Sequence, residues 1–565
     1  MAVSSGTDSG PPVWRAPNGI TTVIWGEVYT DRPLQGTSAA KYVGQCFSRK
    51  RFEDFSQLEG AYVIVMYEEA SRCLYIINDP AGLRPFFYSR TDRAWSFSSF
   101  PSSLRDNRAQ LDPVGLSCFL ANGVFLGDRT HWKGVKKLEP GTACTIDARG
   151  ADFHRYWDYQ FAKKIPKPRK SKLERLKQLD RAVANSVHQR VDEGQPVALL
   201  LTGGHDSLGI LGYIRESAKD TSHVTAFTWS DMAPDSSNDA GIAKSSSAIA
   251  GIRHNLLRFD HSNLESSLRE NVQLTEGLSD AAAYHHSELS LIRKIRNDFG
   301  NEALIQGDQA FGFYRSVRGE TDLFNGLDLR PLCEMSGLLS LLNPSIREEW
   351  ATASREQFDK FNQDCPYTKL NDKKDYFYFN LRQQGFQNAC RRLRLSAISE
   401  HNPLLGAKVL NEAVGQYPCD RINKSLWKEL VEQKFPDLVR SGIARRDGMK
   451  PWAQVFRDDD ATRSTLRQHL VDEPGILAEY FSVDDLRSWA VVLLENSLNT
   501  DQQPSRNFIR RSLSKVGPLK AVVLRAHRTR KRIAGDKYLE PPDERLALRI
   551  LLYKFWLERY ASFSN

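Results

Sequence analysis

Residues Ala198–Ser207 read ALLLTGGHDS, an apolar run that ends in a hydroxyl residue, two glycines, an acid and a second hydroxyl. A helix-compatible stretch, 208–215, follows at once. This order predicts a buried strand, a tight turn and the start of a helix. Glycine leaves the backbone N–H groups of such a turn open, and the helix start adds unpaired N–H groups and a positive dipole end. The stretch is therefore typical of a phosphate-binding site.

The acid in this turn, Asp206, cannot attract phosphate itself. Mg²⁺ takes one or two carboxylates together with phosphate oxygens, so a magnesium ligand is the simplest role for Asp206. The stretch is not the Walker P-loop, which requires a glycine, four residues and then Gly-Lys-Ser/Thr. The structural alternative is a turn that needs its glycines only for shape.

The bulk composition describes a multidomain protein. A chain of 565 residues predicts about two to four units, each with its own core. The net charge of +9 permits an acidic partner or a polyphosphate substrate without requiring nucleic acid. No run approaches the ~20 apolar residues of a membrane span. Residues 1–17 lack the apolar core of a signal peptide.

The eight cysteines are spread along the chain without a C-x-x-C pair. They are too sparse for a disulfide framework and too scattered for a zinc site. We therefore expect reduced thiols and a cytoplasmic protein, with neither a membrane span nor a nucleic-acid partner.

The chain divides into two regions with different patterns. Short β-branched runs at 20–28, 60–67, 73–78 and 84–88, separated by turn signals, indicate stacked antiparallel sheets. Beyond a Pro/Lys-rich segment, strands predicted at 197–201, 224–229 and 303–305 alternate with helices predicted at 173–191, after the second strand through 249, and at 287–299. This alternation predicts a doubly wound parallel sheet with its ligand outside the carboxyl ends of the strands. From about 330 onward the pattern is mostly helical.

Both regions, in this order, resemble the asparagine synthetase superfamily over residues 20 to about 455. WGEVY (25–29) is similar to the family's Asn-Gly-Glu-Ile-Tyr, and NDPAGLRPFFY (78–88) to its Arg-Asp-x-x-Gly-x-x-Pro-Leu-Tyr-Tyr. TGGHDS (202–207) resembles the Ser-Gly-Gly-x-Asp-Ser pyrophosphate loop of ATP pyrophosphatases. SND (237–239) resembles an acid-bearing turn after the second strand, and GDQAFGFY (307–314) a Gly-x-Gly-x-Asp-Glu-x-Phe-Gly-Gly-Tyr loop shortened by about two residues.

The resemblance implies a multidomain α/β fold. An Ntn-hydrolase-like αββα sandwich, a degenerate glutaminase, would precede an adenine nucleotide α-hydrolase-like parallel α/β domain with helical additions. The expected boundaries are a flexible N-terminus at 1–19, the glutaminase-like domain at 20–160, a linker at 161–172, the synthetase domain at 173–460 and a basic helical C-terminal extension at 461–565.

The glutaminase half departs from the family at its nucleophile. Glutaminases of this class use an N-terminal cysteine thiolate, whereas residue 2 here is Ala and the first cysteine is Cys46. Trp25 also replaces the Asn that helps to hold the tetrahedral intermediate. A site without a thiol cannot form a glutamyl thioester, so we expect that this domain makes no ammonia. Processing that exposes Ser4 as a nucleophile is the alternative.

The resemblance also implies the ATP site. The nucleotide-binding residues would be Thr202, Gly203, Gly204, Asp206, Ser207, Thr228 and Gly307, and the Mg²⁺ ligands Asp206 and Asp308. Mg²⁺ on the pyrophosphate would neutralise the charge that develops as the α–β bond of ATP breaks.

The amine-activating groups are less clearly marked. Glu400, three residues before Pro403, matches the Glu-x-x-Pro of β-lactam synthetases, in which a Tyr–Glu dyad deprotonates the attacking amine. The dyad's Tyr falls in the shortened loop, and Tyr284 and Tyr314 are candidates by proximity in sequence. His401 is a second candidate base, against a merely packed histidine.

Lys450 is the candidate for contacting the developing charge on phosphate or on the tetrahedral intermediate, against a solvated basic turn.

The implied reaction is adenylation of a carboxylate, with release of pyrophosphate, followed by attack of an amine. Because the glutaminase lacks its thiol, we expect the amine on the substrate itself, where it has a high effective concentration. A macrolactam synthetase of the lasso-peptide cyclase type is the first hypothesis. An ammonia-dependent asparagine synthetase or a β-lactam-type synthetase is the alternative, and a non-catalytic nucleotide-binding scaffold comes last.

Basic residues past 500 favour a peptide or protein partner, although a solvated helix face explains them equally well. They are Arg506, Arg510, Arg511, Lys515, Lys520, Arg525, Arg528, Arg530, Lys531 and Arg532. The expected partners are a peptide or small molecule that bears a carboxylate and an amine, and a leader peptidase or precursor-recognition protein.

Overall fold

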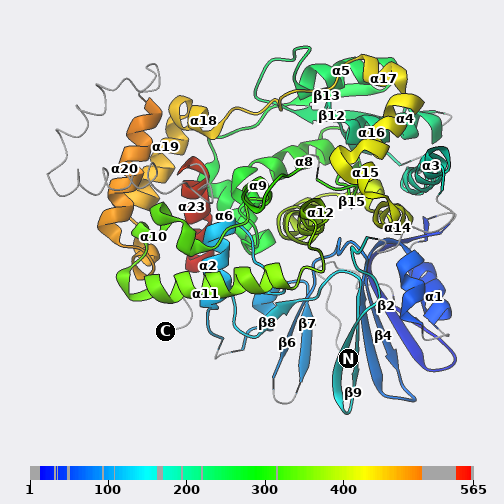
Figure 1. The fold of residues 1–565 in the computed structure, drawn as a ribbon, viewed down its shortest axis with the longest axis horizontal. Coiled ribbons are helices and arrows are strands. Elements are labelled where there is room, and N and C mark those ends of the chain that lie inside the picture. Colours follow the sequence, from blue (N-terminus) through cyan, green and yellow to red (C-terminus); the bar gives the residue numbers. More distant parts are fainter. Residues whose placement is uncertain are drawn as a thin grey trace.

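The computed structural model describes residues 13–561 except 31–32, 35, 48–50, 92–93, 107–108, 162–169, 192–194, 218–219, 314–315 and 499–542. A β-rich domain with the N-terminal strands lies below an α/β domain, and a group of helices lies beside both (Figure 1). Tyr314, the basic residues between Arg506 and Arg532, and Ser4 lie outside the described residues.

Two antiparallel sheets make up the N-terminal domain in the described part of the chain. The large sheet has the order β1-β2-β4-β5-β9-β10, with β3 beside β2, and the small sheet has the order β7-β6-β8. The strands are β1 (Val13–Arg15), β2 (Ile20–Tyr29), β3 (Pro33–Leu34), β4 (Glu59–Glu68), β5 (Cys73–Asn78), β6 (Phe87–Arg90), β7 (Trp95–Ser98), β8 (Val135–Lys137), β9 (Thr142–Asp147) and β10 (Gly150–Arg155). β1 lies within the segment 1–19 that was expected to be flexible.

The alternation of side chains along the strands explains how these sheets stack. Val63 on β4 faces the small sheet, whereas its neighbours Tyr62 and Ile64 face α1 (Thr37–Cys46). On the far side, Phe87 of β6 packs with Phe119 of α2 (Pro113–Asn122). The order of layers is therefore α1, large sheet, small sheet, α2, which confirms the αββα sandwich.

The second domain is built on a parallel sheet with the order β13-β12-β11-β14-β15. Its strands are β11 (Val197–Leu200), β12 (Val224–Trp229), β13 (Arg253–Leu257), β14 (Ala303–Ile305) and β15 (Ser399–His401). The predicted strands at 197–201, 224–229 and 303–305 are confirmed. β13 and β15 were not predicted, because RHNLL and SEH lack a strand-like apolar pattern. The strand order reverses between β11 and β14, which is where doubly wound sheets bind their ligands.

Helices cover both faces of this sheet. α3 (Lys172–His188), α4 (His205–Ser217) and α5 (Asp239–Ala250) share one core with Leu199 and Ile305. α8 (Glu288–Asn297) and α13 (Asn388–Leu395) share another with Ala198 and Leu304. A capping box between Ser171 and Glu174 starts α3 at Lys172, the last residue of the predicted linker.

Helices account for most of the described chain beyond the sheet, as the sequence predicts. They are α6 (Leu264–Thr275), α7 (Ala281–Tyr284), α9 (Glu320–Gly326), α10 (Ser336–Leu341), α11 (Pro344–Gln363), α12 (Leu370–Phe377), the π-helix η5 (Tyr378–Gln387), α14 (Ala407–Gly415), α15 (Pro418–Arg421), α16 (Ser425–Lys434), α17 (Pro436–Arg440), α18 (Trp452–Asp458), α19 (Asp460–Arg467), α20 (Val483–Leu498) and α23 (Asp543–Tyr560). Shorter helices are η2 (Phe52–Gln57), η3 (Pro101–Leu104), η4 (Leu332–Glu334), η6 (Pro403–Leu405), η7 (Ile422–Lys424), η8 (Gln468–Asp472) and η9 (Gly475–Glu479).

The last described helix, α23, differs from the basic extension expected at 461–565. Residues 546–557 are all buried. Their apolar side chains share a cluster with side chains of α2 and α6, and α23 lies near these two helices (Figure 1). Trp556 stacks on His131 of the N-terminal domain, with ring centroids 3.8 Å apart. A helix that is apolar on most sides buries itself in a core, so α23 is an internal element that joins the two domains.

Among the described residues, no helix combines the length and the apolar character that crossing a membrane requires.

Candidate active site

The predicted phosphate loop lies between β11 and α4, as the sequence indicates. Ser207 Oγ donates to the carbonyl of Thr202 at 2.9 Å and accepts from the Thr202 amide at 3.1 Å. The Gly204 amide donates to Thr202 Oγ1 at 3.3 Å. The two hydroxyl residues therefore close the turn on itself directly before the N-terminus of α4, where unpaired N–H groups and the positive dipole end favour an anion.

Gly203 is held from two neighbouring segments. Its amide donates to Asp239 Oδ1 at 2.8 Å, and its carbonyl accepts from the Ala444 amide at 2.9 Å. A Cβ atom on residue 203 would lie 2.5 Å from the Cβ of Ala444, so only glycine fits. Burial raises the pKa of Asp239, although the Gly203 amide opposes this. The acid-bearing turn 237–239 thus supports the phosphate loop.

Asp206 contacts two residues that sequence reasoning missed. Lys424 Nζ donates to Asp206 Oδ2 at 2.6 Å, and Trp427 Nε1 donates to Oδ1 at 2.8 Å. Lys424 and the preceding Asn423 both have left-handed backbone conformations, with φ of 57° and 58°. Such conformations in non-glycine residues cost of order 1–3 kcal/mol and cluster at functional sites. No sequence pattern marks this lysine.

Asp308 comes from the loop after β14 and lies beside the phosphate loop. A Cβ atom on Gly307 would be 3.4 Å from the Ser207 amide nitrogen and 3.5 Å from Asp206 Cβ, so the two loops touch. Arg391 Nη2 donates to Asp308 Oδ2 at 3.1 Å. Burial raises the pKa of Asp308 even though Arg391 opposes it. The predicted pair of carboxylates therefore comes from adjacent strand ends.

Tyr378 is a further polar residue of this site. Its hydroxyl accepts a hydrogen bond from Gln309 Nε2 at 3.3 Å. Burial, and next the charges of Asp308 and Asp206, raise the pKa of Tyr378 well above its usual range. The residue opens the π-helix η5, and π-helical turns occur frequently at functional sites.

Of the two tyrosines proposed from the sequence, the described one, Tyr284, does not take this position. Tyr284 lies in α7, where its ring packs 6.0 Å from that of Trp452, and Tyr314 lies outside the described residues. Of the two described tyrosines, Tyr378 is the one whose pKa is raised by the charges of both predicted metal ligands.

Glu400 lies on β15, next to β14. Its Oε1 accepts hydrogen bonds from Arg391 Nη1, from Arg394 Nη1 at 3.4 Å, from Gln306 Nε2 at 3.0 Å and from Asn402 Nδ2 at 3.1 Å. Its Oε2 is buried without a partner among the described residues. Burial alone would raise the pKa of Glu400, but Arg391 and Arg394 outweigh it and lower the pKa. Glu400 is thus an ionised carboxylate linked to Asp308 through Arg391.

The structure separates His401 from Glu400. Consecutive strand residues point to opposite faces, and His401 faces the N-terminal sandwich. Its Nδ1 lies 2.9 Å from the Tyr29 hydroxyl and 3.0 Å from Glu27 Oε2. Burial would raise the pKa of Glu27, but His401 and then Arg84 hold it well below its usual range. His401 therefore joins the two domains, and this geometry does not support its predicted role as a base.

The backbone of Lys450 lies at the carboxyl edge of the sheet, but its side chain does not. Its amide donates to Asp231 Oδ2, 3.3 Å away, just after β12. Its ammonium is 3.7 Å from Asp458 at the surface. The structure brings Lys424, rather than the Lys450 ammonium, to a predicted metal ligand.

Thr228 lies beneath the phosphate loop. Its hydroxyl donates to the Leu201 carbonyl at 2.6 Å and lies 3.0 Å from His254 Nε2. The Thr228 hydroxyl is therefore used to support the strand that leads into the loop.

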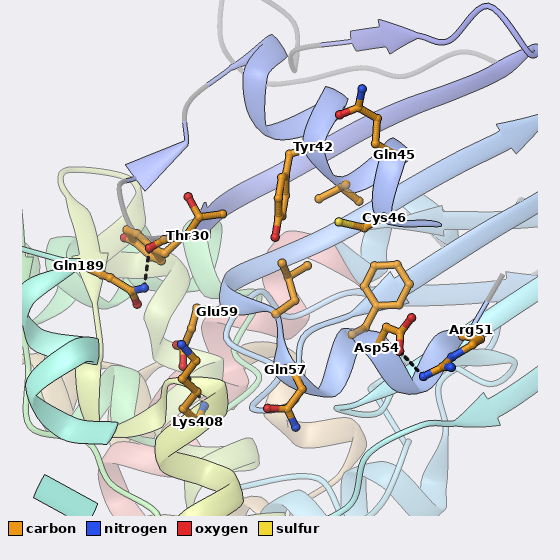
Figure 2. A pocket seen from close by; sticks show the side chains of 14 residues that line it. Thr30, Tyr42, Gln45, Cys46, Arg51, Asp54, Gln57, Glu59, Gln189 and Lys408 are labelled. Atoms are coloured by element: carbon orange, nitrogen blue, oxygen red, sulfur yellow. Dashed lines mark hydrogen bonds and ion pairs between the residues drawn. The ribbon is translucent and has the colours of Figure 1, made fainter. Parts of the chain in front are cut away.

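The sandwich shows no comparable arrangement in its described part. Trp25 packs against Phe86, with ring centroids 6.1 Å apart. Cys46 ends helix α1, so it does not occupy the start of a strand as an N-terminal nucleophile would. It lines a cavity of about 630 Å³ together with Tyr42, Glu59 and Lys408 (Figure 2). None of the predicted site residues lines this cavity.

The geometry defines a two-domain protein that joins an amidotransferase-like sandwich to an ATP-pyrophosphatase-like domain. Residues 29–157 match the glutamine amidotransferase domain family, and residues 178–353 match the asparagine synthase family. With these two domains in this order, the chain belongs to the asparagine synthetase superfamily.

Curated relatives agree with this assignment. Asparagine synthetase [glutamine-hydrolyzing] 3 of Bacillus subtilis (strain 168) is 26% identical over 283 residues, 46% of this chain and 44% of the relative. Amidase chry2 of Gibberella zeae is 22% identical over 404 residues, 64% of this chain and 56% of the relative. The chain thus spans less than two thirds of the length of these relatives. A solved Bacillus subtilis glutamine phosphoribosylpyrophosphate amidotransferase aligns with 13% identity over 44% of this chain and 48% of that one, at a TM-score of 0.18, too low to bear on the fold.

Proposed function

We propose that this chain is an ATP-dependent, AMP-forming amide synthetase that adenylates a substrate carboxylate at the loop 202–207. The observation that carries the proposal is the contact between this loop, which contains Asp206, and the loop that contains Asp308. The two loops follow adjacent strands at the switch point of the parallel sheet. The substrate carboxylate would attack the α-phosphorus of ATP, and pyrophosphate would leave on the loop and the N-terminus of α4.

The donor set fits a magnesium ion. The described residues contain no group of three or more His, Cys, Asp or Glu side chains that could hold a metal. The loops that carry Asp206 and Asp308 touch, and Mg²⁺ can be bound by one or two carboxylates completed by phosphate oxygens and water, so these two residues would hold it. Because burial raises the pKa of Asp308 despite Arg391, a further cation beside it would favour its ionised form. When bound, Mg²⁺ would supply charge neutralisation at the α–β bridge.

The residues of this chain have separate tasks in that step. The ammonium of Lys424 now neutralises Asp206 and, on its long stem, can move to a phosphate oxygen. Arg391 holds Asp308 in place through Nη2, and its Nη1 donates a hydrogen bond to Glu400. Tyr378 places a neutral hydroxyl near both carboxylates.

Glu400 has two possible tasks in the proposed reaction. As a base, it would take the proton of the attacking amine on its unpartnered Oε2. A base works best with a pKa near the working pH, however, and the pKa of Glu400 is lowered. The hydrogen bonds favour a positioning task, in which Glu400 orients Arg391 against Asp308.

The amine is proposed to come from the substrate itself. Residue 2 is Ala and the first cysteine in the sequence is Cys46, so we propose that glutamine does not supply ammonia. An intramolecular macrolactam synthetase of the lasso-peptide cyclase type follows as the first proposal. The relatives named asparagine synthetases support the amide-forming reaction in general. The alternatives for this chain are an ammonia-dependent asparagine synthetase and a β-lactam-type synthetase. The cytoplasmic location and the precursor-recognition partner stay predictions.

The test is ATP–pyrophosphate exchange by the purified chain with Mg²⁺ and a panel of amino acids and peptides that includes aspartate. Asp206→Ala should abolish exchange, whereas Asp152→Ala, at an exposed aspartate of the sandwich, should leave it unchanged. Thermal unfolding of both variants shows whether the fold is kept. Exchange that persists in Asp206→Ala would overturn the loop assignment. Absence of exchange with every carboxylate would favour the nucleotide-binding scaffold.

A further inference from the structure

A cluster of buried and partly buried charges near the proposed site carries more arginines than acids. It consists of Arg330, Arg382, Arg545 and Arg549 with Asp280 and Asp328. Asp280 Oδ2 accepts from Arg545 Nε and Arg549 Nε, both at 3.0 Å. Asp328 accepts from Arg330 at 2.8 Å and from Arg545 at 2.9 Å. Four guanidinium groups thus share two carboxylates, which leaves two positive charges in surplus.

Part of this surplus positive charge is stabilised by other groups inside the protein. Arg549 Nη1 donates to the carbonyls of Leu120 and Ala121 near the end of α2, where the helix dipole is negative. Arg330 is 3% exposed, and its Nε and Nη1 have no hydrogen-bond partner among the described residues. Burial lowers the pKa of Arg330 to about 10 even though Asp328 opposes this. The cluster as a whole would therefore be stabilised by an anion.

Arg382 is the member of the cluster best placed to receive that anion. Its only ion pair in the described structure is a long one, with Nη1 3.8 Å from Asp328 Oδ2, and it donates no hydrogen bond to a described residue. Its guanidinium stacks over the ring of Phe386, 4.4 Å from the centroid. The side chain is 22% exposed. Arg382 thus combines a fixed orientation with donors that no described residue occupies and that solvent can reach.

The position of Arg382 connects the cluster to the reaction centre. Arg382 follows Tyr378 by about one turn of the π-helix, and the two side chains interact electrostatically. The Tyr378 hydroxyl accepts a hydrogen bond from Gln309, the residue that follows Asp308. On the other side, Arg545 of α23 lies 5.8 Å from the ring of Phe386. The two arginines are therefore connected to the segment of Asp308 through Phe386, η5 and Gln309.

We propose that Arg382, with Arg545 beside it and Phe386 beneath it, binds a second carboxylate of the substrate, one that is not adenylated. The planar guanidinium binds carboxylates through two parallel hydrogen bonds, and stacking on an aromatic ring fixes its plane. The phosphates of ATP have their own place at the start of α4, which leaves this subsite to the substrate. The inference rests on the proposed function and narrows its substrate class to compounds with at least two carboxylates, such as a peptide with a further acidic side chain or a free C-terminus.

The kinetic test compares matched peptides in the exchange assay. Each pair differs only in Glu against Gln, or in a free against an amidated C-terminus, outside the activated carboxylate. The diacid should have at least a tenfold lower KM. Arg382→Gln should raise the KM of the diacid about tenfold while kcat, the KM for ATP and the KM of the amidated peptide stay unchanged, and Arg382→Lys should recover part of the loss. Arg293→Gln, at an exposed arginine paired with Glu270, serves as the control. Equal KM values within every pair would overturn the proposal.

A binding test without ATP separates this inference from the proposed function. Isothermal titration calorimetry measures the binding of glutarate and of inorganic phosphate to the wild-type chain and to Arg382→Gln. Saturable glutarate binding that the variant loses supports the subsite even if no carboxylate supports exchange, in which case only the proposed function fails. Absence of glutarate binding to the wild type, or tighter binding of phosphate than of glutarate at Arg382, would overturn it.

Discussion

The carboxyl edge of the parallel sheet and the strand ends of the sandwich both carry aspartates, and the two sets differ in their donors. Asp79 in the sandwich accepts hydrogen bonds from the backbone amides of Tyr62, Ala81 and Leu83. Asp206 in the synthetase domain accepts from the side chains of Lys424 and Trp427. Backbone donors cannot move without unfolding the turn, whereas a lysine ammonium on a four-carbon stem can leave.

This difference separates carboxylates that hold the fold from carboxylates that are free to change partner. Burial raises the pKa of Asp79 to about 6, yet three fixed amides still oppose this. Glu27 is also held, through His401, at the junction between the two domains. Although both halves match family models, we expect chemistry only where the donors are exchangeable.

The largest expected effect concerns Asp280, a buried carboxylate whose side-chain donors are two arginines. Asp280 is 2% exposed; burial would raise its pKa, but Arg545 and Arg549 lower it to about 2. Asp280→Asn removes the charge that compensates two buried guanidinium groups and should cost about 3–5 kcal/mol of unfolding free energy at pH 7. Denaturant unfolding measures this loss.

The same carboxylate predicts how wild-type stability depends on pH. The folded pKa of about 2 lies below the usual unfolded value of about 3.9. The stabilisation is therefore complete above the unfolded pKa and is lost as the pH falls toward 2, by about 2–3 kcal/mol. Asp280→Asn should flatten this acid limb, and Asp152→Asn should not. An unchanged acid limb in Asp280→Asn would contradict the assignment.

An intermediate effect is expected from Glu400→Gln, which removes the charge that orients Arg391. Loss of such an outer partner typically costs roughly 10- to 100-fold in activity. If Glu400 positions Asp308 through Arg391, the exchange half-reaction should fall by this amount. If Glu400 acts only as the base, exchange should stay normal and amide formation alone should be lost. Measuring both half-reactions in one variant therefore separates the two roles.

The smallest effect is expected from the matching change in the sandwich, Glu27→Gln. It weakens the contact between Glu27 and His401 and should destabilise the chain by about 1 kcal/mol. Exchange activity should change by less than about twofold, since neither residue contacts Asp206 or Asp308. A large fall in exchange would show that the sandwich controls the synthetase site through β15, and the distinction drawn between the two halves would fail.

Several features could be read from local sequence. The apolar run before Thr202 and the glycines after it encode a strand and a turn whatever their surroundings. The strands 224–229 and 303–305 also have strong local patterns, and doubly wound topology places their ends together. The adjacency of Asp206 and Asp308 follows from these elements.

Other features depend on long-range packing and left no local signal. β15 has the polar sequence SEH and is a strand only because it pairs with β14. That pairing sets the alternation that sends Glu400 to one face and His401 to the other. Lys424 reaches Asp206 through a strained backbone. Neither its distance in sequence from Asp206 nor its neighbours in sequence predict this contact.

By itself, the sequence determined the two-domain order, the absence of a thiol at residue 2 and the phosphate loop, because each depends on residue types within a few positions of one another. Only the tertiary structure decided which charges meet. It brought Lys424 to Asp206, linked Glu400 to Asp308 through Arg391, and placed the C-terminal helix α23 beside Arg382. Electrostatic interactions depend on distance and burial, and both are set when segments remote in the chain pack together.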